Sequence, residues 1–139
     1  MRDGIVAGLS MVVASIVLVT ILSLCGLAYG RDNGQWGDAD PIVKAWISKL
    51  KMPDNPLMSC CGEADAYWAD SYEVGPNGEY VAIITDERDV PGRLPREVGT
   101  KVVIPNSKIK WDQGNPSGHG WVFISPGNIL YCYLPPGGV

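Results

Sequence analysis

A long apolar stretch at the start of the chain limits where the remainder can fold. No charged residue lies between Gly4 and Gly30, and residues 5–24 are dominated by Val, Ile, Leu, Ala and Met. A run of about 20 apolar residues is long enough to cross a bilayer as a helix. Residues 31–139 are therefore expected outside the cytoplasm, either in the periplasm or secreted.

Two main interpretations of residues 1–30 remain open. Small residues at Ala28 and Gly30 are typical of the site at which a secretory signal peptide is cleaved. The apolar run is longer than the roughly 7–15 residues of a signal-peptide core, which favours an uncleaved inner-membrane anchor through residues 5–28. A lipid-modified Cys25 is a third interpretation, but Leu24 stands where a bacterial lipobox has Gly or Ala.

The composition predicts a turn-rich domain with little helix. The 139 residues include 17 glycines and 11 prolines, both of which favour turns. The net charge is −4 and the lysines and arginines form no cluster, so no nucleic-acid partner is expected. Residues 31–39 are expected to form a tether and residues 40–139 a single disulfide-tied domain.

One short helix and several strands are expected in that domain. Asp40 and Pro41 are typical of a helix start, and Ile42, Val43, Trp46, Ile47 and Leu50 follow at helical spacing. The helix is expected to pack against a sheet, the alternative being a partner-binding helix with Trp46 as its anchor. Strand-like segments lie at residues 72–74, 79–84, 101–104, 108–111, 121–124 and 129–134.

These segments predict a mainly β (α+β) fold. Residues 72–84 and 121–134 are each expected to form a hairpin, and Leu130, Cys132 and Leu134 to share one face of the last strand. The polar residues 85–100 form a loop long enough to be either mobile or functional. The expected architecture is a small barrel-like or bent antiparallel sheet with one amphipathic helix.

An odd number of cysteines follows the apolar stretch: Cys60, Cys61 and Cys132. In an oxidising compartment Cys132 is the only distant partner for the adjacent pair. Cys61 is the preferred partner because Gly62 lets the backbone turn directly after it, and Cys60 is the alternative. The remaining thiol would be buried or would pair with another chain, whereas a ring between Cys60 and Cys61 would be strained.

The segment Ser59–Asp70 carries the densest group of chemically useful side chains. Together with His119 it predicts a binding surface formed by Glu63, Asp65, Tyr67, Trp68, Asp70 and His119. The sole histidine could act as a general base with Asp65 or Asp112. A structural histidine is favoured, since the chain has no nucleophile motif. Asp65 could instead cap a helical turn over Ala66–Ala69.

The sequence favours no metal site, no cofactor site and no carbohydrate site. Cys60, Cys61, Cys132 and His119 are formally a zinc set, but adjacent cysteines ligate one tetrahedral ion poorly. Glu63, Asp65 and Asp70 lack the spacing of a calcium loop. We expect no metal and no cofactor. A carbohydrate-stacking face is less expected than a hydrophobic core for the aromatic residues Trp36, Trp68, Trp111, Trp121, Tyr67, Tyr131 and Tyr133.

The motifs CCGEAD at residues 60–65 and YCYLPPGG at residues 131–138 resemble those of a group of small exported bacterial hypothetical proteins of the alphaproteobacterial type. The similarity covers residues 42–139. Many members have a further cysteine directly after the Ala-Asp pair, where this chain has Ala66. The resemblance implies export and a disulfide-tied domain, and it implies no catalytic residue because the group has no assigned activity.

The expected function is therefore that of a non-enzymatic envelope or secreted domain that binds another protein or a cell-wall component. The first alternative is a hydrolase or metal-assisted enzyme that uses His119 with Asp65 or Asp112. The second is a structural surface or phage-associated component held through an intermolecular disulfide.

Overall fold

The computed structural model describes residues 36–137, and its first element is helix α2 (Pro41–Ile47). The Asp40 carboxylate caps the helix by accepting a hydrogen bond from the Ile42 N–H at 2.7 Å, as the sequence predicts. The helix is shorter than expected. Ile42, expected on the apolar face, is 69% exposed, because the chain is buried only from Ile47, the last residue of the helix, and at Leu50 after it.

Six strands form two antiparallel sheets within the described residues. The first sheet has the order β1-β5-β6 and consists of β1 (Asp65–Trp68), β5 (Trp121–Ile124) and β6 (Leu130–Leu134). The second has the order β2-β3-β4 and consists of β2 (Ser71–Val74), β3 (Tyr80–Ile83) and β4 (Lys101–Ile104). The mainly β fold class and both hairpins are therefore confirmed.

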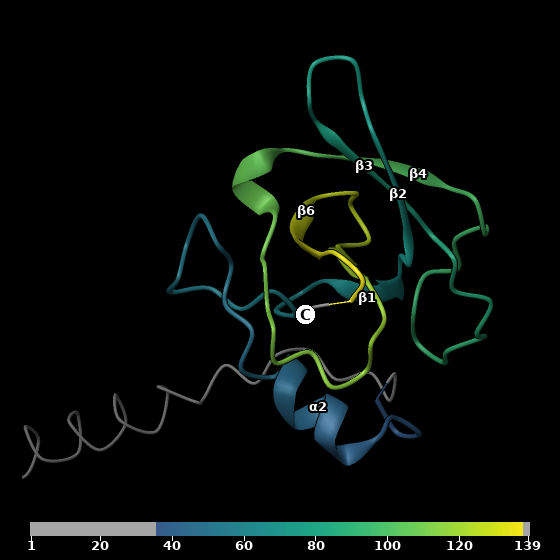
Figure 1. Ribbon diagram of the computed structural model, residues 1–139. Helices are drawn as coiled ribbons and strands as arrows, with labels where there is room; N and C mark the ends of the chain where they lie inside the picture. The colour runs from purple at the N-terminus through teal and green to yellow at the C-terminus, as the bar shows by residue number, and fades with distance from the viewer. Residues whose placement is uncertain (1–35, 138–139) are drawn as a thin grey trace, which may run out of the picture.

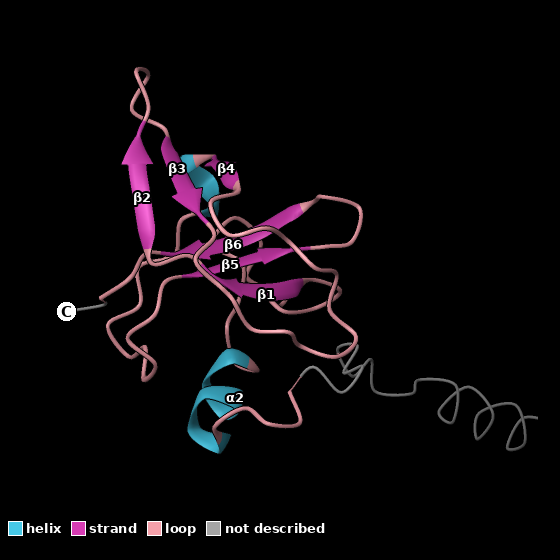
Figure 2. Cartoon of the chain, turned by 90° about the vertical axis from the view of Figure 1, so that its right-hand side faces the viewer, coloured by secondary structure: helices cyan, strands magenta, loops and turns pink. Residues whose placement is uncertain are grey.

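The sheet of β1, β5 and β6 is the middle layer of the structure, with α2 on one side and the other sheet opposite (Figures 1 and 2). The core is accordingly divided into two clusters. On the helix side, Ile47 and Leu50 pack with Trp121 and Phe123. On the sheet side, Ile84 and Ile104 pack with Val122, Ile124 and Tyr133. Alternate side chains of β5 thus enter opposite clusters, which explains its unbroken apolar sequence.

Three local predictions are wrong. Leu130 does not share a face with Cys132, because a bulge shifts the β5–β6 register and places Leu130 in the sheet-side cluster. Residues 108–111 form no strand, since the chain turns into the 3-10 helix η1 (Asn106–Lys108) after Pro105 and Ile109 makes only an isolated bridge to Tyr133. Residues 66–69 form no helical turn, because Ala66–Trp68 pair with β5.

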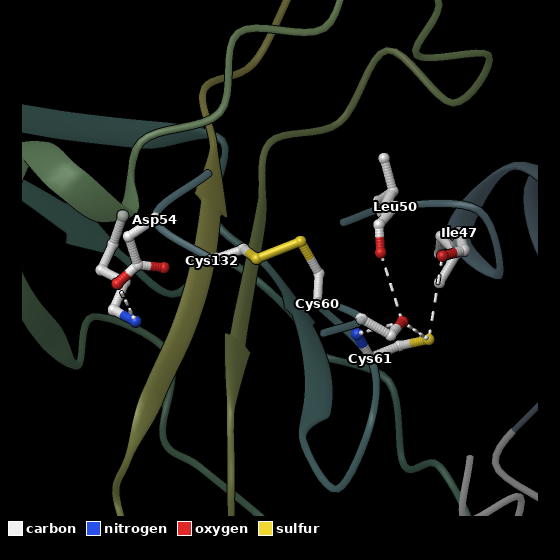
Figure 3. Close-up of a disulfide and its surroundings, with 8 residues drawn as sticks. Ile47, Leu50, Asp54, Cys60, Cys61 and Cys132 are labelled. Atoms are coloured by element: carbon white, nitrogen blue, oxygen red, sulfur yellow. Dashed lines mark hydrogen bonds and ion pairs between the residues drawn. A yellow bond between two sulfur atoms is a disulfide. The ribbon is translucent and has the colours of Figure 1, made fainter. Parts of the chain in front are cut away.

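The disulfide joins Cys60 to Cys132, so the preference for Cys61 is wrong and the alternative is correct (Figure 3). Cys60 is fully buried, and its N–H donates to the Leu50 carbonyl at 3.0 Å, which directs its side chain into the helix-side cluster. Cys61 is a half-buried free thiol whose Sγ lies 3.2 Å from Ser59 Oγ.

The predictions for residues 1–30, including the signal peptide, the anchor and Cys25, lie outside the described residues. Within residues 36–137, no helix has both the length and the apolar character needed to span a bilayer.

Loss of the disulfide is expected to destabilise the domain strongly. The bond closes a loop with a sequence separation of 72 residues, and chain-entropy arithmetic gives about 4 kcal/mol for a loop of that size. We expect the double variant Cys60→Ala/Cys132→Ala to lose roughly this free energy of unfolding in urea titrations. The control is Cys61→Ser, which should retain the disulfide and nearly all of the stability. An equal loss in Cys61→Ser would contradict the pairing.

Candidate functional site

A cleft with a volume of about 550 Å³ lies on the helix side of the middle sheet. One wall comes from residues 36–43, the opposite wall from residues 88–93, and the end from residues 116–119. Ala66 and Trp68 of β1 and Trp121 of β5 complete the lining. Apolar and aromatic side chains alternate with the charged or polar lining residues Asp38, Asp40, Arg88, Asp89, Arg93, Ser117 and His119.

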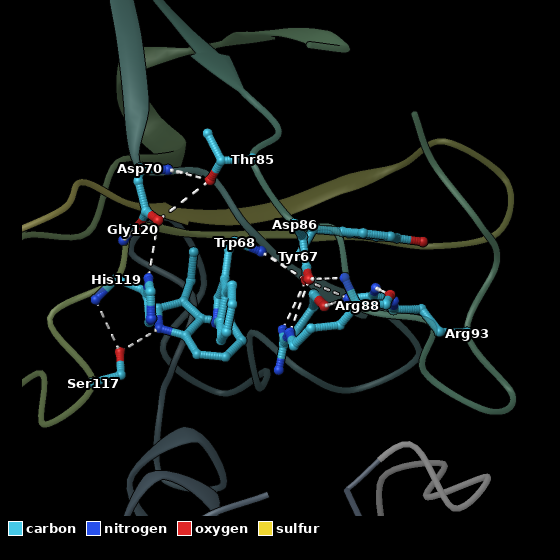
Figure 4. Close-up of polar contacts among 12 residues, drawn as sticks. Tyr67, Trp68, Asp70, Thr85, Asp86, Arg88, Arg93, Ser117, His119 and Gly120 are labelled. Carbon is cyan, nitrogen blue, oxygen red and sulfur yellow. Dashed lines mark hydrogen bonds and ion pairs between the residues drawn. The ribbon is translucent and has the colours of Figure 1, made fainter. Parts of the chain in front are cut away.

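The wall at residues 88–93 is fixed to β1 by the buried carboxylate of Asp86 (Figure 4). Its two oxygens accept hydrogen bonds from Arg88 Nε at 2.8 Å and Arg88 Nη2 at 2.7 Å, and from Arg93 Nη1. Asp86 also accepts the Trp68 backbone N–H at 3.1 Å, while Arg93 donates to the Ala66 carbonyl at 3.0 Å. The loop predicted to be mobile or functional is therefore bonded to the sheet at several points.

Burial disfavours the charged form of Asp86, but hydrogen bonds from Arg88 and Arg93, together with backbone N–H groups, outweigh it. They hold the pKa of Asp86 well below its usual value of 3.8. Asp86 is thus a carboxylate throughout the physiological pH range.

Trp68 lies between His119 and Arg88 on one wall of the cleft (Figure 4). The His119 ring stacks on the indole with 3.9 Å between centroids and 13° between planes. The Arg88 guanidinium carbon lies 3.6 Å from the Trp68 ring centroid. The cation–π interaction between a guanidinium and an indole is favourable. Stacking on the ring also fixes the orientation of the Arg88 guanidinium. Both broad faces of Trp68 are therefore occupied.

Asp70 positions His119 and the segment that leads into β5. Its Oδ2 lies 2.9 Å from His119 Nδ1, and its Oδ1 accepts the Gly120 N–H at 2.8 Å. Gly120 is required by close packing, because a Cβ there would lie 2.2 Å from the Ala69 carbonyl oxygen. The backbone of Gly120 therefore lies directly against that of Ala69.

The hydroxyl of Ser117, which lines the cleft, is a candidate nucleophile, but its donor and both acceptor positions are used in hydrogen bonds within the protein. It donates to Asn115 Oδ1 at 2.7 Å and accepts from Trp121 Nε1 at 2.8 Å and from the His119 N–H at 3.2 Å. A nucleophilic hydroxyl needs its proton directed at a base. Ser117 therefore acts as a structural link between the 115–119 turn and β5.

Of the residues predicted for the binding surface, the structure brings together Trp68, Asp70 and His119. Asp65 and Tyr67 lie on the opposite face of β1 from Trp68, because side chains alternate along a strand. There the Tyr67 hydroxyl donates to the Leu94 carbonyl at 2.6 Å, and Asp65 Oδ2 accepts the Leu94 N–H at 3.1 Å. Burial raises the pKa of Tyr67, which keeps this donor protonated.

The predicted pairing of His119 with Asp65 or Asp112 is therefore wrong, since the ring contacts Asp70. Asp112 instead accepts from Trp46 Nε1 at 3.2 Å and from the Gly114 N–H at 2.8 Å. Glu63 is exposed and outside the cleft lining. The zinc set is not formed, because Cys60 and Cys132 are bonded to each other. Across residues 36–137, no group of three potential metal-ligating His, Cys, Asp or Glu residues occurs.

The predicted core role holds for three of the seven aromatic residues, whereas Trp36, Trp68 and Tyr131 are only partly buried and pack against the helix-side cluster. Tyr67, Trp121 and Tyr133 are at most 2% exposed. Trp111 is the exception at 68% exposed, and it packs edge-on against Tyr80 rather than entering the core.

The sequence interpretation missed the arginine wall of the cleft. Asp86, Arg88 and Arg93 are spaced two and five residues apart within one polar loop, and nothing in that spacing indicates that one carboxylate binds both guanidiniums. The one available signal was the length of the loop itself.

Comparison with known proteins finds no matching family model, curated protein or solved structure.

Removal of the Asp86 charge is expected to weaken the domain and to change its response to acid. Asp86→Asn leaves two guanidiniums around a neutral amide, and removal of one partner from a buried ion pair costs roughly 3 kcal/mol or more. Because folding lowers the pKa of Asp86, its contribution is complete above the usual value of 3.8 and declines as the pH falls below it.

The difference in free energy of unfolding between wild type and Asp86→Asn should therefore shrink in urea titrations below that pH. The control is Glu73→Gln, which removes an exposed carboxylate paired with Lys101 and should cost about 1 kcal/mol or less. A difference that grows in acid would contradict this account.

Proposed function

We propose that the protein is an exported, non-enzymatic binding domain. Its ligand belongs to another protein or to the cell wall and occupies the cleft between residues 36–43 and 88–93. A concave site with mainly apolar walls and a few polar groups is the usual form of a small-ligand site. The volume of about 550 Å³ lies within the range of such sites.

The observation that carries this proposal is that the polar groups around the cleft are already bonded to one another. Asp70, Asp86 and Ser117 each have multiple hydrogen-bond partners within the protein. Such bonding gives the cleft a fixed shape before a ligand arrives, which lowers the entropy cost of binding. It also leaves no hydroxyl or thiol in the cleft lining directed at a general base.

The proposed location is the periplasm or the secreted fraction, with attachment to the inner membrane if residues 5–28 are not cleaved. The Cys60–Cys132 disulfide is consistent with an oxidising environment.

Obstruction of the cleft is expected to abolish binding. Val90 is a half-buried lining residue, and Val90→Trp adds an indole to the cleft without changing its charge. We expect this variant to lose co-sedimentation with purified cell-wall sacculi, or capture of a cross-linked exported partner, whichever the wild type shows. The control is Val103→Trp, on the other sheet at a position 62% exposed. Equal binding by the two variants would contradict a ligand in the cleft.

A hydrolase is the second candidate, and one observation favours it. His119 lines the cleft with Nδ1 on the Asp70 carboxylate, the orientation in which a histidine presents Nε2 as a general base. A water molecule would then have to be the nucleophile. The structural-component alternative has less support, because the free Cys61 thiol is half-buried and lies 3.7 Å from the Ile47 carbonyl oxygen.

The variant His119→Gln separates binding from hydrolysis. A glutamine amide can still donate to Asp70 but cannot serve as a general base, so we expect ligand binding to stay within about threefold of wild type. Bound cell-wall fragments should be recovered chemically unchanged from both proteins, as measured by mass spectrometry. Cleavage by wild type that disappears in His119→Gln would establish the hydrolase instead.

A further inference from the structure

We infer that the ligand of the cleft is a short peptide segment whose free C-terminal carboxylate binds Arg88. This inference rests on the proposed function and specifies its ligand.

The first argument is the charge balance around Asp86. One carboxylate binds two guanidiniums, so the group of Asp86, Arg88 and Arg93 carries one surplus positive charge. The side chain of Asp86 is 0% exposed and that of Arg93 is 6% exposed, whereas that of Arg88 is 36% exposed. The surplus charge is therefore presented to a ligand at Arg88.

The second argument is the geometry of that guanidinium. Arg88 Nε and Nη2 are bonded to Asp86, and the group lies over the Trp68 ring. No described residue accepts a hydrogen bond from its Nη1. An arginine held by one edge can offer the other edge to a second carboxylate as a pair of parallel hydrogen bonds. Asp86 and Trp68 thus fix the orientation of the donor in advance.

The third argument is the chemistry of the facing wall. Asp38 and Asp40 are exposed carboxylates at the edge of the cleft, and Val43 and Trp36 supply apolar surface beside them. A polyanion such as a nucleotide would be repelled by Asp38, Asp40 and Asp89, whereas a single carboxylate can pair with the guanidinium of Arg88. A peptide end combines that carboxylate with apolar side chains, and a cationic group in it would be favoured near Asp38.

The aromatic side chains of the cleft argue against a sugar as the group recognised. A sugar ring binds to an open aromatic face, but both faces of Trp68 are covered and Trp121 is 2% exposed, so only the half-buried Trp36 could offer one. A peptide carboxylate remains, and it has two natural sources. Protein C-termini carry L-residues, whereas the stem peptides of the bacterial cell wall end in D-residues.

The test uses isothermal titration of the full chain with three forms of one tripeptide, Lys-Val-Ala. These are the free acid, its C-terminal amide, and the free acid with D-Ala at its end. Hydrogen bonds between charged groups contribute about 1.5–3 kcal/mol, so the amide should bind roughly 10- to 100-fold more weakly than the better acid. Preference for the D-form identifies the cell wall as the source, and preference for the L-form identifies a protein terminus.

Arg88→Met should remove the distinction between acid and amide. The fold should persist in this variant, because Asp86 retains Arg93 and two backbone N–H groups, and the near-ultraviolet circular dichroism of the tryptophans checks this. Lys101→Met is the matched control, since it removes an exposed positive charge on the other sheet, and it should retain the distinction.

Two outcomes overturn the inference. If acid and amide bind wild type equally, or if neither binds while sacculi or a protein partner still do, the carboxylate is not what Arg88 recognises. In either case the proposed function stands as long as Val90→Trp blocks binding. If Val90→Trp has no effect on any binding, the proposed function itself fails.

Discussion

The carboxylate of Asp86 connects the long loop, the first strand and the cleft. An unpaired charge in that position would cost several kcal/mol, and Arg88, Arg93 and the Trp68 N–H together supply the compensation. Buried ion pairs add little net stability compared with apolar residues of the same size. The contribution of Asp86 is better described as specificity, because it permits one position of residues 88–93 relative to β1. In that position residues 88–93 form one wall of the cleft.

The middle sheet has a comparable role for the core. Because β5 contributes side chains to both clusters, a shift of either the helix layer or the second sheet would expose apolar surface of the middle sheet. The disulfide adds a covalent constraint on the helix side, between the segment that follows α2 and β6. The loops lie outside these constraints, and their positions depend on polar contacts instead. The cleft is built mainly from such loops, at residues 88–93 and 116–119.

The sequence predicts the elements of this fold much better than it predicts the site. Periodicity and turn residues locate α2 and both hairpins because these depend on neighbours within a few residues. The pairing of Cys60 depends on distant packing, and the face of β6 on which Leu130 lies depends on a bulge, so no local sequence pattern predicts either. Likewise Trp68, Asp70 and His119 were selected for their chemistry, but the Asp70–His119 contact spans 49 residues. The two arginines were missed because charged loop residues usually face solvent.

The hydrogen bonds made to the unpaired edge of β1 have a further consequence for solubility. Among the described strands β1 pairs only with β5, which would normally leave a row of unsatisfied backbone groups open to another chain. Here the Trp68 N–H is taken by Asp86, the Ala66 carbonyl by Arg93 and the Trp68 carbonyl by the Thr85 N–H. Intermolecular strand addition and amyloid-like stacking are therefore blocked at this edge.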